Sequence, residues 1–275
     1  MLIAIGSLKA SPGATTTAQA LAAMWPAAGC GQPLLLEADP AGGDVAARFS
    51  LSPEPGLVSL SAAARHEHGT DLLAEHAVEL PGGLPAIAAP PAEEAARAAV
   101  GMLGRDGLPL LRAAAGDGDL ALVADVGRLQ WDSPAWPVVE AAGVLLLVAR
   151  PILPELSRVI SAAGQLAARL ETCGTRVGLV TIGDGPFGAA EIAEATGIEV
   201  AARLPEDGAA AAMLAGRPDP RGTLSRLAGR GGIAGLPLAR AAAELGTQLA
   251  RELERATART AHVEDAVSEP IGARI

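Results

Sequence analysis

Aromatic residues are scarce in this sequence. They make up 2% of the chain, and tyrosine is absent altogether. Because half of all residues are nevertheless hydrophobic, the core must be built from alanine, leucine, valine and isoleucine. A chain of 275 residues is long enough for one large α/β domain with a substantial core.

Cysteine is scarce as well, and long apolar runs are missing. The two cysteines, Cys30 and Cys173, stand alone and provide neither a disulfide framework nor a metal-binding spacing. No apolar run approaches the roughly 18 residues that a membrane span needs. The chain enters an apolar segment directly, without the regions of a signal peptide. We therefore expect a cytoplasmic protein.

Positive charge is limited as well. The formal net charge is −10, and Lys9 is the only lysine in the chain. Nucleic-acid binding requires basic patches, so this excess of negative charge argues against a protein whose whole surface binds nucleic acid. Four arginines in a Gly/Pro-rich stretch, between Arg217 and Arg230, leave a local patch open.

What the sequence does contain is a strand, a loop and a helix at its start. The apolar run Leu2–Ile5 leads into a loop rich in small residues, and a helical pattern follows from Thr15. In a phosphate-binding loop, backbone N–H groups and the helix N-terminus converge on the anion. Gly13 and Thr15 match the usual G-x-x-x-x-G-K-[ST] pattern, whereas Ala14 replaces its lysine.

The segment from Lys9 to Thr16 resembles the deviant Walker A loop of the ParA/MinD family of P-loop ATPases, K-G-G-x-G-K-T-T. Lys9 corresponds to the signature lysine of that family, and a solvated loop lysine is the alternative reading. The resemblance implies ATP binding by Lys9, Pro12, Gly13, Ala14, Thr15 and Thr16, with a catalytic role for Lys9. In the family this lysine reaches the phosphates bound by the partner in a nucleotide-sandwich homodimer.

A second match follows the short apolar strand Pro33–Ala38. The sequence Glu37-Ala38-Asp39-Pro40 is similar to the family's D-x-D-P-x-G, with Glu37 in place of the first aspartate. A carboxylate at this strand end can hold Mg²⁺ or orient an attacking water, which implies catalytic and metal roles for Asp39. A simple Asp-Pro turn is the alternative.

The strand Leu120–Asp125 resembles the family's Walker B strand. Its aspartate, Asp125, would join Thr15 and Asp39 around Mg²⁺. Arg128 departs from the small residues that the family usually has nearby.

Two later strands are similar to those that contact the base in the family. The end of the strand Arg176–Ile182, from Thr181 to Gly185, corresponds to the segment with which the family contacts the base, although the family's asparagine is absent. The strand Ile198–Leu204 precedes Pro205 and Glu206, which resemble the family's P-[ED]-D segment. We expect Thr181, Pro205 and Glu206 to contribute to nucleotide binding.

Strands and helices alternate through most of the chain, which predicts a doubly wound, mostly parallel sheet with helices on both faces. Residues 50–118 are less regular, with a helix expected from Leu57, a strand at Leu84–Ala89 and a helix from Pro91. We interpret His66-x-His68 as a surface turn. We expect one domain over residues 1–258, a last helix that ends near Thr257, and a disordered tail at 259–275.

The resemblance implies a ParA/MinD-like protein with ATP and Mg²⁺ as cofactors and a homodimer as the active form. Replacement of the second lysine by Ala14 removes about 1.5–3 kcal/mol of phosphate binding. We therefore expect a slow ATPase or switch that positions a cellular machine with partner proteins, like the TadZ/CpaE group. An active DNA-partitioning ATPase and a nucleotide-free scaffold are the alternatives, with DNA less favoured. The C-terminal segment lacks the apolar face of a membrane-targeting helix.

Overall fold

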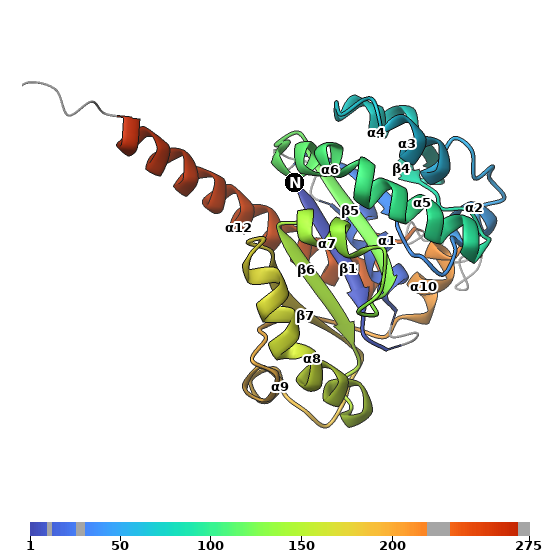
Figure 1. The fold of residues 1–275 in the computed structure, drawn as a ribbon. Helices are drawn as coiled ribbons and strands as arrows, with labels where there is room; N and C mark the ends of the chain where they lie inside the picture. Colours follow the sequence, from blue (N-terminus) through green and yellow to red (C-terminus); the bar gives the residue numbers. More distant parts are fainter. Residues whose placement is uncertain (10–12, 26–30, 219–231, 269–275) are drawn as a thin grey trace, which may run out of the picture.

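The computed structural model describes residues 1–9, 13–25, 31–218 and 232–268, and for residues 253–268 only the course of the backbone. Eight strands form one sheet in the order β3-β4-β2-β5-β1-β6-β7-β8. Figure 1 shows the ribbon of the chain, with β1, β4, β5, β6 and β7 labelled. All neighbours are parallel except β3 and β4, which are antiparallel. The strands are β1 (Leu2–Ser7), β2 (Gln32–Glu37), β3 (Val78–Leu80), β4 (Leu84–Ile87), β5 (Leu120–Arg128), β6 (Val144–Ala149), β7 (Arg176–Ile182) and β8 (Val200–Leu204).

Helices cover both faces of this sheet, as expected for a doubly wound fold. On one face α1, α10 and α12 pack with Ile3 and Ile5 of β1, and on the other face α3 and α5 to α9 pack with Leu2 and Ala4. The helices are α1 (Ala14–Ala23), α2 (Val45–Arg48), α3 (Leu57–Ala63), α4 (Asp71–Glu75), α5 (Glu93–Asp106), α6 (Leu108–Gly116), α7 (Trp136–Ala141), α8 (Leu153–Glu171), α9 (Ala189–Thr196), α10 (Gly208–Leu214) and α12 (Pro237–Ser268).

The sheet brings the predicted motifs to one edge. Strand β1 lies at the centre, buried along its whole length, between β5 and β6. Its apolar sequence fits this position because a central parallel strand is covered on both faces. Since β1, β2 and β5 run in the same direction side by side, the segments that follow Ser7, Glu37 and Asp125 meet at the same carboxyl edge.

The irregular middle of the chain contains more structure than its pattern predicts. The structure confirms α3, β4 and α5, and adds the hairpin strand β3 and the helices α4 and α6. Strand β3 and helix α4 are too short to produce a recognisable periodic pattern, and α6 follows α5 almost directly. Within the described part of the chain, no helix combines the length and apolar character required to cross a bilayer.

The end of the last helix requires a correction. Helix α12 continues to Ser268 instead of ending near Thr257, so the backbone of residues 259–268 is helical. The segment between Gly246 and Pro270 contains neither glycine nor proline and is rich in alanine, glutamate and arginine, all of which favour helix. In Figure 1 this helix extends well beyond the sheet. Residues 269–275 lie outside the described residues.

Candidate functional site

The loop after β1 leads into α1 through a left-handed glycine. Gly13 has φ 96°, a conformation that glycine adopts without the steric penalty of a Cβ. Its carbonyl accepts the backbone N–H of Thr17 at 2.9 Å, which closes the first turn of α1. Lys9 is exposed just beyond β1, and Thr15 and Thr16 are half-buried in the first turn. Pro12 lies outside the described residues.

Asp125 lies on β5 and is almost completely buried. The Thr15 hydroxyl donates a hydrogen bond to its carboxylate, and the backbone N–H of Gly127 donates to Oδ1 at 3.0 Å. Burial raises the pKa of Asp125 to about 6, with repulsion by Asp39 adding to the shift and the two hydrogen bonds opposing it. The predicted Walker B aspartate therefore faces the start of α1.

Asp39 follows β2 at the same edge of the sheet. Its Oδ1 accepts the backbone N–H of Ala41 at 2.8 Å. Burial raises its pKa, and the neighbouring Asp44 contributes to the shift. The carboxylate lies directly against the backbone of Gly127, where a Cβ would overlap it. Thr15, Asp39 and Asp125, which we predicted to share a metal ion, thus lie together.

Glu37 has a role that sequence reasoning did not find. Its Oε1 accepts the backbone N–H groups of Asp44 and Val45 at 2.7 and 3.1 Å, and its Oε2 accepts that of Ala89 at 2.9 Å. Burial raises the pKa of Glu37 to about 7 in spite of these three bonds. The side chain thereby joins the end of β2 to the start of α2 and to the loop after β4. The only sequence signal was a carboxylate at the end of an apolar strand.

The residues around Asp125 fit a magnesium ion bound together with a phosphate group. Two carboxylates whose pKa values are raised and one hydroxyl are hard oxygen ligands of the kind that Mg²⁺ takes. The described residues contain no group of three or more His, Cys, Asp or Glu side chains that could hold a metal ion, His66 and His68 included. Phosphate oxygens and waters would have to complete the coordination, as is usual for Mg²⁺ in nucleotide sites.

A cavity of about 200 Å³ adjoins the start of α1. The predicted residues Gly13, Thr16, Pro205 and Glu206 line it, together with Thr17, Arg150, Ile182, Asp207, Gly208, Ala211 and Leu238. Within this lining, Arg150 and Glu206 form an exposed ion pair at 3.6 Å. The segments after β1, β6, β7 and β8 therefore enclose one concave space.

Thr181 differs in position from the other residues that we predicted to contact the base. Its side chain is fully buried and does not line this cavity, whereas the next residue, Ile182, does. Successive residues of a strand point to opposite faces, and both faces of β7 are covered. Hydrophobicity therefore could not indicate which residue faces the site.

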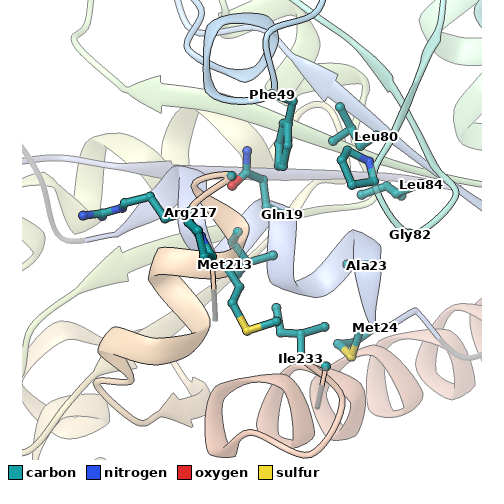
Figure 2. Close-up of a pocket in the computed structure, with 15 residues that line it drawn as sticks. Gln19, Ala23, Met24, Phe49, Leu80, Gly82, Leu84, Met213, Arg217 and Ile233 are labelled. Carbon is teal, nitrogen blue, oxygen red and sulfur yellow. The ribbon is translucent and has the colours of Figure 1, made fainter. Parts of the chain in front are cut away.

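A larger, mostly apolar cavity of about 400 Å³ lies on the far flank of α1 (Figure 2). Phe49, Leu80 and Met213 contribute to its wall, as does Gln19 of α1. Gln19 Oε1 accepts a hydrogen bond from Arg48 at 3.3 Å, and Arg48 pairs with Asp44 at 3.1 Å. These contacts connect the middle of α1 to α2, whose first turn Glu37 holds.

A central parallel strand, a glycine loop at a helix N-terminus and buried carboxylates on the adjacent strands define the fold of P-loop nucleotide-binding proteins. Within that class, the structure matches ParA and MinD ATPases. A ParA family ATPase from Chlorobium tepidum TLS matches with a TM-score of 0.66 and 16% identity over 90% of this chain and 98% of that one. The Pyrococcus furiosus cell division ATPase MinD matches with a TM-score of 0.64 and 17% identity, over 91% of this chain and 98% of that one.

The septum site-determining protein MinD from Pyrococcus horikoshii, a complex with Mg-ADP, gives a TM-score of 0.63 and 16% identity over 90% of this chain and 95% of that one. No family model matches the sequence, and no curated protein matches it either. At these identities the comparisons show the fold, and they confirm the predicted ParA/MinD-type architecture.

Proposed function

We propose that this chain is a ParA/MinD-like protein that binds ATP with Mg²⁺ and acts as a dimeric switch or slow ATPase that positions a cellular machine. The observation that carries the proposal is the cluster at the carboxyl edge of the sheet, where Thr15 donates to the buried Asp125 and Asp39 lies beside them. Asp39 and Asp125 repel each other when both are ionised, and a divalent cation between them would relieve that repulsion.

Each part of the site has a role in this proposal. The N–H groups at the start of α1 would bind phosphate, and the cavity lined by Pro205 and Glu206 would take the base. Lys9, exposed beyond β1, would act across a homodimer on the phosphates held by the second copy. Ala14, buried at the first position of α1, provides no cation of its own, which favours slow over fast hydrolysis. Proteins of the TadZ/CpaE kind, which position pilus and secretion machines, are the functional model.

Titration calorimetry with ATP and Mg²⁺, combined with light scattering, tests this proposal. We expect ATP to bind the wild type and produce a dimer, Lys9→Ala to bind ATP without dimerising, and Asp125→Asn to lose the contribution of Mg²⁺. Omission of Mg²⁺ should reduce the wild type to the level of Asp125→Asn. If millimolar ATP does not bind, the nucleotide switch is wrong and the chain is a scaffold.

A DNA-partitioning ATPase is the second candidate. Of the arginines that suggested it, Arg217 is exposed, while Arg221, Arg226 and Arg230 lie outside the described residues. Affinity for nonspecific DNA that falls steeply with salt would favour this candidate, because phosphate contacts release counterions.

A further inference from the structure

An exposed tryptophan lies in a groove that shares no lining residue with the cavity beside Pro205 and Glu206. Trp131 is 44% exposed and belongs to the segment between β5 and α7. The groove has a volume of about 410 Å³ and is lined by Leu8, Arg128, Leu129, Gln130, Trp131, Asp132, Trp136, Arg158, Ser161, Ala162 and Gln165. Leu8 directly precedes Lys9, so the groove begins next to the phosphate loop.

A series of contacts holds Trp131 in place although it faces solvent. Its ring stacks in parallel on Trp136, with centroids 5.6 Å apart and an interplanar angle of 5°. Trp136 is buried, and its indole N–H donates to the carbonyl of Gln130 at 2.8 Å. The guanidinium of Arg169 lies 4.1 Å from the centroid of Trp136 and pairs with Glu140 at 2.7 Å. A fixed ring loses little side-chain entropy when a partner covers it.

The groove also carries positive charge without an internal partner. Arg128 and Arg158 are both exposed, and neither forms an ion pair with another described residue. The one acidic residue in the wall, Asp132, pairs at 3.6 Å with Arg97, which lies outside the groove. The lining is therefore basic in a chain whose net charge is −10.

We propose that this groove is a docking site for an acidic segment of a partner protein. Tryptophan and arginine are the residue types that dominate the binding energy of protein interfaces. Arg128 and Arg158 would bind carboxylates of the partner, and an apolar side chain between those carboxylates would cover Trp131. A nucleic acid fits less well, because Asp132 and the acidic surface of the chain repel a continuous phosphate backbone. The proposal does not depend on nucleotide binding.

Fluorescence anisotropy in low salt, without nucleotide, tests the site with a labelled peptide of alternating glutamate and leucine. We expect binding that the double variant Arg128→Glu/Arg158→Glu weakens roughly tenfold or more, and Trp131→Ala to a similar extent. A matched lysine–leucine peptide should fail to bind the wild type and should bind the double variant. Arg112→Glu on α6 and Ile160→Ala on α8, both exposed positions outside the groove, should leave the affinity unchanged.

Three results would overturn the proposal. The first is equal affinity of the acidic peptide for the wild type and the groove variants. The second is tighter binding of single-stranded DNA that requires Trp131, which would make the groove a nucleic-acid surface. In the third, the double variant binds the peptide normally but loses self-association in sedimentation, which would assign the groove to a second copy. Circular dichroism of each variant verifies that it is folded.

Discussion

Gly127 lies against the carboxylate of Asp39, with no room between them for a side chain. Gly127 has φ 60°, and its backbone N–H donates to Asp125. Its backbone therefore contacts both carboxylates of the cluster. We predict that Gly127→Ala displaces Asp39, lowers the free energy of unfolding by about 1–3 kcal/mol and weakens Mg²⁺-dependent ATP binding. Urea unfolding and calorimetry measure the two effects.

Gly164 provides the matched control for this substitution. It lies within α8, and a Cβ there would meet nothing within 4 Å. Gly164→Ala should therefore raise stability by about 0.5–1 kcal/mol, since alanine favours the helix interior. If Gly127→Ala also raises stability, the position of the Asp39 carboxylate does not depend on its close approach to Gly127.

The raised pKa of Glu37 predicts how stability varies with pH. Between its ordinary value of 4.5 and about 7, the folded chain keeps a proton that the unfolded chain releases. This contribution to stability is therefore complete below pH 4.5 and is lost as the pH rises through 7, on the order of 3 kcal/mol. Glu37→Gln should flatten this dependence, as measured by urea midpoints between pH 4.5 and 8.

Two further features sharpen that measurement. Glutamine cannot accept hydrogen bonds at both ends, so at pH 4.5, where the wild type keeps its full contribution, Glu37→Gln should be less stable than the wild type by about 1–3 kcal/mol. Glu79→Gln, on an exposed residue of β3, should change neither the slope nor the midpoint. A slope that is unaltered by Glu37→Gln would show that another group titrates.

Thr181 allows a test of burial against function. Its hydroxyl has no hydrogen-bond partner among the described residues, although the side chain is fully buried. Thr181→Val keeps the shape and removes the unsatisfied group, so we predict a gain of about 1 kcal/mol in stability with unchanged ATP affinity. Thr175→Val should instead lose about 1 kcal/mol, because that hydroxyl donates to the carbonyls of Val139 and Glu140. A loss of ATP affinity in Thr181→Val would instead support the prediction that Thr181 contacts the base.

The missing lysine can be returned to the phosphate loop. If ATP binds as proposed, Ala14→Lys should strengthen binding by roughly tenfold or more, the effect of one added charged hydrogen bond. Ala167→Lys, which adds the same charge on the exposed face of α8, should leave the affinity unchanged. If the wild type, Ala14→Lys and Ala167→Lys bind ATP equally well in calorimetry, the phosphates do not lie near position 14.

The sequence by itself determined the architecture and the position of the loop, because both follow from local patterns. Short continuous apolar segments such as Leu2–Ile5 are typical of buried parallel strands, and parallel strands bring their carboxyl ends to one edge. The neighbourhood of Thr15, Asp39 and Asp125 follows from that rule. Their binding of Mg²⁺ and ATP remains a prediction.

Only the tertiary structure decided what lies against what. The three bonds of Glu37, the close approach of Gly127 to Asp39 and the stack of Trp131 on Trp136 join segments whose distance and orientation depend on the packing of the whole sheet. The burial of Thr181 was equally hidden, since a strand covered on both faces has no periodic pattern to orient it. The length of α12 was readable from the absence of glycine and proline between Gly246 and Pro270, but the polar composition of this segment led us to predict that the helix ends near Thr257.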